Sequence, residues 1–373
     1  MSLPRKKIII SGGGTGGHIF PAVAIADGLK SRLDNPEILF IGAKGRMEME
    51  KVPKAGYKIE GLWISGIQRN LTIKNLTFPI KLISSLMKAG KIIRKFKPDV
   101  AIGTGGYASG PMLRVASKRG IPSLIQEQNS YPGITNRILS KTVDKICVAF
   151  EGMERHFPSS RMVFTGNPVR QDIIHLDGKR EEGIGFFKLQ QGVKTILIIG
   201  GSQGARSVNI AIGNKLEQIL RNDVQLLWQC GSAFFETAIG ICDKLPEEIA
   251  AKVKVQDFIY RMDLAYAASD IVISRAGAIA ISELCIAGKP VMLIPLPIAA
   301  EDHQTKNALA LVDRDAAILL KDHALEDELL PAITGLLQDE EKQITMGNNI
   351  KKLARPEATE EIVNEVIKLL ERK

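Results

Sequence analysis

Short runs of consecutive apolar residues recur along the chain and alternate with longer segments of helical periodicity. A short, uninterrupted apolar run indicates a strand buried on both faces, and strands that alternate with helices form a parallel sheet covered by helices. The pattern therefore predicts an α/β fold. We expect strands at residues 7–11, 37–41, 99–102, 123–126 and 145–149, and again at residues 195–199, 225–229, 253–255, 271–274 and 291–294.

The two halves of the chain open in the same way, with a strand, a glycine-rich loop and a helix. The two loops are residues 11–18, before a helix expected from about residue 20, and residues 200–205. The length of 373 residues exceeds one average domain, and proline and glycine break the pattern near residue 166. We therefore predict two Rossmann-like domains, residues 1–166 and 167–355. An amphipathic helix at about residues 356–373 could close either domain, including by packing back on the first.

The first glycine loop joins a strand directly to a helix. Glycine lets a ligand approach the backbone amides closely, and a helix N-terminus offers unpaired N–H groups to a phosphate. The loop therefore indicates an anion site, and a plain tight turn is the alternative. A further glycine-rich loop at residues 103–111 could complete a two-sided cradle for a diphosphate, unless it only packs on its neighbours.

The first loop also matches a dinucleotide-binding motif. Gly12, Gly14 and Gly17 fit the G-x-G-x-x-G pattern. That pattern is normally followed by an acid at the end of the second strand, whereas this chain has Lys44 and Arg46, which would suit a 2′-phosphate. An NADP-linked oxidoreductase is therefore the rival interpretation. The second glycine loop favours a sugar-nucleotide transferase with a ligand cleft between two Rossmann-like domains.

Three side chains stand where an open α/β sheet places its ligands. His18 lies at the first glycine loop, where a histidine can bind an anion or act as a base near neutral pH. Glu127 follows a strand end and is a second candidate base, and Asn129 beside it could instead cap a helix. Glu283 falls in the first turns of a helix, where it could accept both ribose hydroxyls or simply interact with the helix dipole.

The net charge of +9 suggests an anionic partner. From residue 61 to residue 98 basic and apolar residues interleave without any acid, which suits an anionic membrane surface. We predict peripheral membrane contact through residues about 67–95, with a core-packed helix and solvated lysines as the alternative. Few aromatic residues accompany the lysines, so nucleic acid is not expected. Without a signal-peptide core or a membrane span, we expect a cytoplasmic location.

Metal binding and disulfide chemistry have little support in the sequence. The four cysteines lie far apart, which implies neither a zinc site nor a dithiol site. Asp313 and Asp315 match the D-x-D pattern that holds a metal-bound diphosphate in some transferases, but no glycine loop lies beside them. We therefore expect no metal ion and no cofactor.

Seven segments carry the motifs of a known family: residues 13–21, 105–111, 127–129, 166–170, 200–205, 275–283 and 301–307. Taken in order, they resemble the MurG family of N-acetylglucosaminyltransferases over nearly the whole chain. The resemblance implies the GT-B fold and an inverting, metal-independent reaction at the cytoplasmic face of the bacterial plasma membrane. In it, N-acetylglucosamine passes from UDP-N-acetylglucosamine to the 4-hydroxyl of undecaprenyl-diphospho-N-acetylmuramoyl-pentapeptide (lipid I), forming lipid II for peptidoglycan. A GT-B transferase with a different acceptor and a binding protein without transfer stay open.

The resemblance also implies the site residues. Glu283 would bind the ribose, Ser202 would lie near the diphosphate, and Ile259 would hold the uracil through its backbone. His18 would be the general base, with Glu127 as its competitor. The acceptor would meet His18, Gly105, Gly106, Tyr107 and Glu127. The donor would meet Thr15, Gly16, Gly17, Asn129, Arg170, Ser202, Ile259, Ala278, Ile279, Ala280, Ile281, Ser282, Glu283 and Gln304.

Two positions depart from the family pattern. Gln126 stands where the family often has histidine, and Ala280 stands where it often has threonine. The second change removes a hydroxyl that could contact the sugar or a phosphate. Neither change removes a residue assigned to catalysis.

Overall fold

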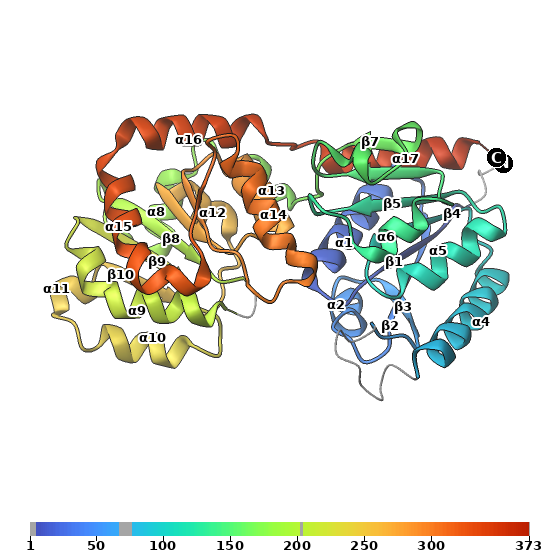
Figure 1. Ribbon diagram of the computed structural model, residues 1–373, viewed down its shortest axis with the longest axis horizontal. Coiled ribbons are helices and arrows are strands. Elements are labelled where there is room, and N and C mark those ends of the chain that lie inside the picture. Colours follow the sequence, from blue (N-terminus) through green and yellow to red (C-terminus); the bar gives the residue numbers. More distant parts are fainter. Residues whose placement is uncertain (1–4, 67–76, 202–203, 373) are drawn as a thin grey trace. The chain divides into compact units, whose positions relative to one another are not determined.

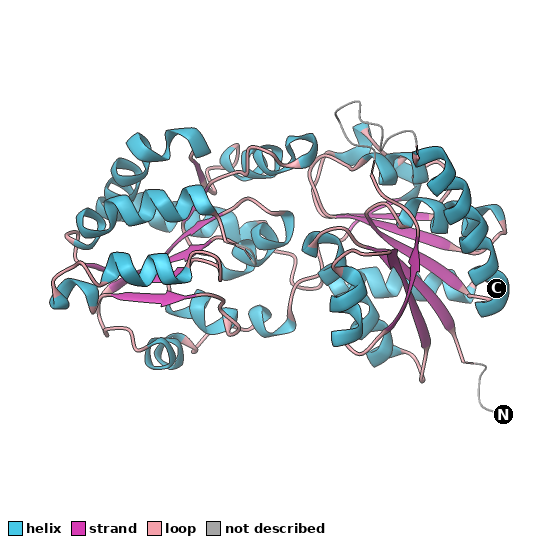
Figure 2. Cartoon of the chain, turned by 90° about the horizontal axis from the view of Figure 1, so that it is seen from below, coloured by secondary structure: helices cyan, strands magenta, loops and turns pink. Residues whose placement is uncertain are grey.

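The computed structural model describes residues 5–66, 77–201 and 204–372 (Figure 1). The chain divides into two compact units, one of Met1–Val169 with Pro356–Lys373 and the other of Arg170–Arg355. Each unit contains one parallel sheet with helices packed on it (Figure 2). The predicted α/β fold with two Rossmann-like domains is confirmed.

The first unit has a seven-stranded sheet in the order β3-β2-β1-β4-β5-β6-β7. The strand order reverses between β1 and β4, which is where open α/β sheets bind their ligands. Two of its strands, β3 and β7, are absent from the sequence prediction because β3 mixes polar and apolar residues and β7 is very short. The strands are β1 (Lys7–Gly12), β2 (Glu37–Ala43), β3 (Lys58–Leu62), β4 (Val100–Gly105), β5 (Ser123–Glu127), β6 (Lys145–Val148) and β7 (Met162–Phe164).

The second unit has a six-stranded sheet in the order β10-β9-β8-β11-β12-β13, and its order reverses between β8 and β11. All five strands expected in this half are present. The extra edge strand, β13, is too short to leave a periodic signal. The strands are β8 (Lys194–Ile199), β9 (Val224–Gln229), β10 (Val253–Gln256), β11 (Ile271–Ser274), β12 (Val291–Leu293) and β13 (Ile318–Leu319).

Helices fill the connections between the strands. The first helix starts at Gly16 rather than near residue 20, because the glycines after Thr15 already have helical geometry. In the first unit the helices are α1 (Gly16–Arg32), α2 (Glu48–Lys54), α4 (Phe78–Phe96), α5 (Ser109–Lys118), α6 (Ile134–Leu139) and α17 (Ala358–Glu371). In the second they are α7 (Gln171–Ile174), α8 (Arg180–Phe187), α9 (Arg206–Leu220), α10 (Phe235–Cys242), α11 (Glu247–Ala250), α12 (Met262–Ala268), α13 (Ala278–Ala287), α14 (His303–Val312), α15 (Leu325–Gln338) and α16 (Glu340–Lys352).

The position of β1 in the middle of the sheet explains why its sequence is apolar without interruption. Ile8 and Ile10 pack into a core cluster that includes residues of α1 and α17, whereas Ile9 packs into the cluster under α4 and α5. Successive side chains of a strand point to opposite faces, so a strand covered on both sides needs apolar residues at every position. The C-terminal helix α17 thus completes one face of the first unit.

Close contact between α1 and α17 depends on Gly28. A Cβ at position 28 would lie 2.9 Å from Cγ2 of Val363. On α17, the buried Glu365 forms ion pairs with Lys145 at 3.6 Å and with Lys368 at 2.6 Å. Among the described residues, no helix combines the length and the apolar character needed to cross a membrane.

Candidate functional site

The side chain of His18 is held by the first glycine loop. Its Nδ1 lies 3.0 Å from the carbonyl oxygen of Gly13 and 3.3 Å from Oγ1 of Thr15. A carbonyl oxygen only accepts hydrogen bonds, so this geometry assigns the ring hydrogen to Nδ1. In the neutral ring the lone pair then lies on Nε2, which is the form that a general base requires.

The loop after β4 packs against the first glycine loop. Gly105 has φ +97°, and a Cβ there would lie 2.8 Å from Cδ2 of His18. Gly106 has φ +83°, and a Cβ there would lie 2.2 Å from the carbonyl oxygen of Gly13. Only glycine meets both demands, a positive φ and no side chain. The structure thus brings Gly105 and Gly106 to His18, and the half-exposed ring of the next residue, Tyr107, lies against Gly66.

The other candidate base, Glu127, is buried at the end of β5 with 2% of its surface exposed. Its carboxylate accepts hydrogen bonds from the backbone N–H and side-chain amide of Asn129, at 3.0 and 3.2 Å. It also accepts from the N–H of Gly133 at 3.1 Å and from Nδ2 of Asn136 at 2.9 Å. These contacts shape the loop between β5 and α6, so Glu127 would have to give some of them up to take a proton.

Gln126, one of the two departures from the family pattern, has a structural role beside Glu127. It is fully buried, and its Nε2 donates to Oδ1 of Asn167 at 2.8 Å. The amide of Asn167 in turn donates to the carbonyl oxygen of Gln128 at 3.0 Å. Gln126 therefore ties the end of β5 to the segment that leaves the first unit.

In the second unit, the N-terminus of α13 presents the predicted donor residues. Gly277 precedes the helix with φ −68° and ψ 140°, and the first turn contains no acidic residue. The positive end of the helix dipole lies at this N-terminus and suits a phosphate. The side chain of Ile281 is only 1% exposed and that of Ala278 is 9% exposed, so these two can reach a ligand through their main chain alone.

Glu283 projects from the second turn of α13 and is 12% exposed. One carboxylate oxygen lies 3.3 Å from Nε of Arg170, and the other accepts from the hydroxyl of Tyr266 at 3.3 Å. Burial raises the pKa of Glu283 above its ordinary value even though Arg170 opposes the shift. Burial, followed by the nearby Glu283, likewise holds the pKa of the Tyr266 hydroxyl well above its usual range.

Ile259 lies in the loop after β10 and Gln304 lies in the first turn of α14, and both are already hydrogen-bonded. The N–H of Ile259 donates to Oε1 of Gln229 at 2.9 Å, and Nε2 of Gln229 donates to the carbonyl oxygen of Gly201 at 3.2 Å. Oε1 of Gln304 accepts from the N–H of Leu296 at 2.9 Å. A uracil contact through the Ile259 N–H would therefore displace the Gln229 amide.

The remaining predicted residues are placed as follows. Thr15 and Gly17 are exposed and Gly16 is half-buried at the start of α1, whereas Ile279, Ala280 and Ser282 are half-buried in α13. Ser202 lies outside the described residues. Across the chain the structure describes, no group of three or more His, Cys, Asp or Glu side chains is arranged to hold a metal ion.

Comparison with known proteins identifies the family. The chain matches the glycosyltransferase family 28 N-terminal domain at residues 8–148 and the C-terminal domain of the same family at residues 195–362. A solved structure titled as MurG of Acinetobacter baumannii is 30% identical, with a TM-score of 0.80 over 98% of this chain and 100% of that one. The chain belongs to the MurG family of glycosyltransferase family 28.

Curated members of the MurG family are similar over their full length. A protein of Flavobacterium psychrophilum is 57% identical over 99% of both chains, and one of Christiangramia forsetii is 54% identical over 98% of both. Each is named UDP-N-acetylglucosamine–N-acetylmuramyl-(pentapeptide) pyrophosphoryl-undecaprenol N-acetylglucosamine transferase. The predicted family, the GT-B fold and the assignment as a glycosyltransferase are confirmed. The NADP-linked oxidoreductase finds no support.

Sequence reasoning missed three residues that build the site of this MurG-family chain. Glu48 supports the first glycine loop, and Gln229 joins the second glycine loop to Ile259. Arg275 enters the sequence prediction only as the first residue of the segment 275–283. Its Nη1 donates to the carbonyl oxygens of Ile294 and Pro295, both at 3.2 Å, and so fixes the ends of β11 and β12. For Gln229 and Arg275 the available signal was a polar residue at or just after the carboxyl end of a buried strand.

Replacing Glu283 should weaken donor binding in this MurG-family enzyme. Glu283→Gln keeps the size of the side chain but leaves one good acceptor for two ribose hydroxyls. Loss of a hydrogen bond to a charged group costs about 1.5–3 kcal/mol, or roughly 10-fold to 100-fold in affinity. Calorimetric titration with UDP-N-acetylglucosamine should show this loss, whereas Glu248→Gln, at an exposed carboxylate of the same unit, should bind normally.

The raised pKa of Glu283 gives the same experiment a pH signature. As pH falls through that raised value, protonation removes the charge that the hydroxyls would meet, so wild-type affinity should decline and the variant should lack this decline. The stability of the folded protein changes with pH in the opposite direction to the donor affinity. The reason is that the folded state binds this proton more tightly than the unfolded state. The group therefore lowers stability as pH rises from the ordinary to the raised pKa. Equal donor affinity of Glu283→Gln and wild type would refute the ribose assignment.

Proposed function

We propose that this enzyme transfers N-acetylglucosamine from UDP-N-acetylglucosamine to the 4-hydroxyl of undecaprenyl-diphospho-N-acetylmuramoyl-pentapeptide, with inversion and without a metal ion, forming lipid II. The observation that carries the proposal is identity above 50% over essentially the full length of proteins named for this transfer. The candidate residues support it, because they follow the carboxyl ends of strands in the two sheets, which is where α/β folds bind ligands.

The two units have separate tasks in this proposal. The unit Arg170–Arg355 binds the uridine and diphosphate of the donor, through Glu283, Arg170 and the N-terminus of α13. The unit Met1–Val169 with Pro356–Lys373 binds the acceptor, through His18, Gly105, Gly106 and Tyr107.

The reaction requires a base and a stabilised leaving group. Nε2 of His18 removes the proton of the acceptor hydroxyl while that oxygen bonds to the anomeric carbon. The bond from that carbon to the diphosphate breaks, and the negative charge passes to UDP. The N-terminus of α13 and the guanidinium of Arg170 stabilise this charge, which is where preorganised dipoles contribute most to catalysis.

The transfer itself is tested with labelled UDP-N-acetylglucosamine and a short-chain diphospho-muramoyl-pentapeptide lipid in the presence of EDTA. Labelled lipid should form at an unchanged rate with the chelator, because the proposed site stabilises the leaving group with protein dipoles and Arg170. If the donor binds but no labelled lipid forms, the acceptor assignment is wrong. If EDTA abolishes transfer, the metal-free mechanism is wrong.

His18→Ala should lower kcat by about 100-fold to 10,000-fold, the range expected for the loss of a general base, with little change in donor affinity. The matched control is His175→Ala, because His175 is an exposed histidine elsewhere in the chain. Steady-state rates for both variants in the same transfer assay make the comparison. Near-normal turnover of His18→Ala would move the base assignment to Glu127.

We also propose peripheral contact with an anionic membrane at the cytoplasmic face, through α4. One side of α4 packs on the core with Ala89, Ile92 and Ile93. Another side exposes a row of apolar side chains, with Ile80 62% and Ile83 59% exposed. The alternative of a core-packed helix with solvated lysines accounts for the core side of α4. It does not account for the exposed apolar side.

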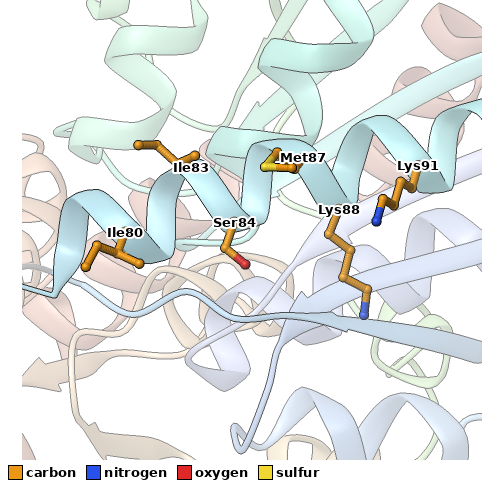
Figure 3. Close-up of a pocket in the computed structure, with 6 residues that line it drawn as sticks. All are labelled: Ile80, Ile83, Ser84, Met87, Lys88 and Lys91. Carbon is orange, nitrogen blue, oxygen red and sulfur yellow. The ribbon is translucent and has the colours of Figure 1, made fainter.

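The exposed side of α4 carries basic residues beside the apolar row. A pocket of about 620 Å³ runs along it, lined by Ile80, Ile83, Ser84, Met87, Lys88 and Lys91 (Figure 3). Apolar side chains that enter the lipid boundary, next to cations that meet lipid phosphates, are the pattern of an interfacial helix. Residues 67–76, the start of the predicted membrane segment, lie outside the described residues.

Vesicles test the membrane contact. Anionic vesicles should co-sediment the protein and salt should release it, because each basic residue near the surface contributes about 1 kcal/mol that salt screens. Ile83→Glu should weaken the co-sedimentation by placing an acid in the apolar row. Ile344→Glu, at a 65% exposed isoleucine of the other unit, is the matched control. Equal binding to neutral and anionic vesicles would contradict the proposal.

A further inference from the structure

Glu48 is a completely buried acid for which the mechanism above has no use. It is the first residue of α2, and its surface is 0% exposed. Charged side chains are almost never fully buried unless partners satisfy them. Its carboxylate accepts from the backbone N–H of Gly14 through Oε2 and from that of Ala43 through Oε1, both at 2.9 Å. Glu48 therefore links the end of β2 to the first glycine loop.

Two glycines make room for this side chain. A Cβ at position 13 would lie 2.2 Å from Oε1 of Glu48, and a Cβ at position 42 would lie 2.5 Å from its Cγ. Both distances are far below van der Waals contact, so neither position tolerates a side chain while Glu48 is in place. Glycine at these two positions is thus explained by the buried carboxyl group.

One peptide group connects Glu48 to His18. The N–H of Gly14, which donates to Glu48, and the carbonyl of Gly13, which accepts from Nδ1 of His18 at 3.0 Å, belong to the same peptide bond. In a trans peptide these two groups point in opposite directions. Glu48 and His18 therefore lie at opposite ends of one peptide group, in the order carboxylate, N–H, C=O and Nδ1–H.

The peptide between two glycines rotates more easily than any other, because neither residue has a Cβ to restrict it. If the Gly13–Gly14 peptide turned over, its carbonyl would leave Nδ1, and the ring of His18 could take the other tautomer. The tautomer of a histidine is set by the hydrogen bond that its second nitrogen makes. Hydrogen bonds in series also polarise one another, which strengthens the Gly13 carbonyl as an acceptor.

We propose that Glu48 is a positioning residue that acts through the Gly13–Gly14 peptide and holds His18 with its hydrogen on Nδ1 and its lone pair on Nε2. The inference rests on the proposed function, in which Nε2 of His18 removes the acceptor proton. It assigns Glu48 no contact with either substrate. The Glu48 carboxylate fixes the orientation of the Gly13–Gly14 peptide, and the carbonyl of that peptide fixes the tautomer of His18.

Glu48→Gln is the direct test, because it keeps the shape but turns one accepting oxygen into an NH₂ group that faces a backbone N–H. Removing an outer partner of a metal-bound histidine typically lowers metal affinity or activity by about 10-fold to 100-fold, and a histidine base that depends on its outer partner should respond to a similar degree. We expect a fall of that size in kcat, with an unchanged KM for UDP-N-acetylglucosamine. Glu50→Gln is the matched control, since Glu50 lies on the same helix with its side chain 66% exposed, and its kcat should not change.

Combining the variants separates this inference from the function it rests on. If Glu48 acts only through His18, Glu48→Gln should cause no further loss in the His18→Ala background. Losses that multiply would overturn the role of Glu48 and leave His18 as the base. Normal turnover of His18→Ala alone would instead overturn the base assignment, and with it this inference.

If Glu48→Gln fails to fold, nitrogen NMR of the wild-type enzyme still tests the proposal, because it reports the tautomer of His18 directly. With ¹⁵N-labelled histidine, the signal that disappears in His18→Ala belongs to His18. We expect neutral His18 to show a protonated Nδ1 and an unprotonated Nε2, and a folded Glu48→Gln to show a mixture of both tautomers. The opposite tautomer in the wild type would overturn the proposal.

Discussion

The absence of side chains where the loops after β1 and β4 meet is the constraint on which the first unit depends. A Cβ at position 12 would lie 2.0 Å from Oγ1 of Thr104, and one at position 106 would lie 2.2 Å from the Gly13 carbonyl. With glycine at both places, Oγ1 of Thr104 can donate to the carbonyl oxygen of His18 at 2.8 Å. The loops can then stack, and His18 comes to lie over Gly105. Larger residues would separate the loops and remove the site.

Most of the fold could be predicted because its strands are covered on both faces and are therefore apolar at every position. The strands β3, β7 and β13 could not be predicted, since they lie toward or at sheet edges and are mixed in polarity or only a few residues long. The mixture of basic and apolar residues in α4 is visible in the sequence, but its separate core and exposed sides follow only from the packing. Sequence periodicity shows that a helix has an apolar side without showing what covers it.

In the candidate site, too, some residues could be located from the sequence and others could not. His18, Gly105 and Glu283 could be placed from the sequence because each stands at a strand end or helix start. The partners of Glu48 could not, because they are backbone N–H groups, which any residue can supply and which carry no sequence signal. Glu48 belongs to none of the sequence motifs described above. Its role depends on Gly14, 34 residues earlier in the chain.

The fold alone does not separate a transferase from its structural neighbours. A UDP-GlcNAc 2-epimerase from Neisseria meningitidis has a TM-score of 0.66 at 16% identity, over 97% of this chain and 100% of its own. The assignment of a reaction therefore depends on particular side chains and on the relatives with high identity. The buried Glu48 and Glu127 and the partly buried Glu283 show how similar groups can differ in what they are able to do.

Those glutamates differ in whether a ligand can replace their partners. Glu48 and Glu127 are held by groups of the protein's own scaffold, and leaving such a buried group unsatisfied costs about 1–3 kcal/mol. Glu283 is held partly by Arg170, whose side chain is 42% exposed and can turn toward solvent or a phosphate. A ligand hydroxyl can then take its place. This difference favours Glu283 as a ligand-binding acid and His18, rather than Glu127, as the base.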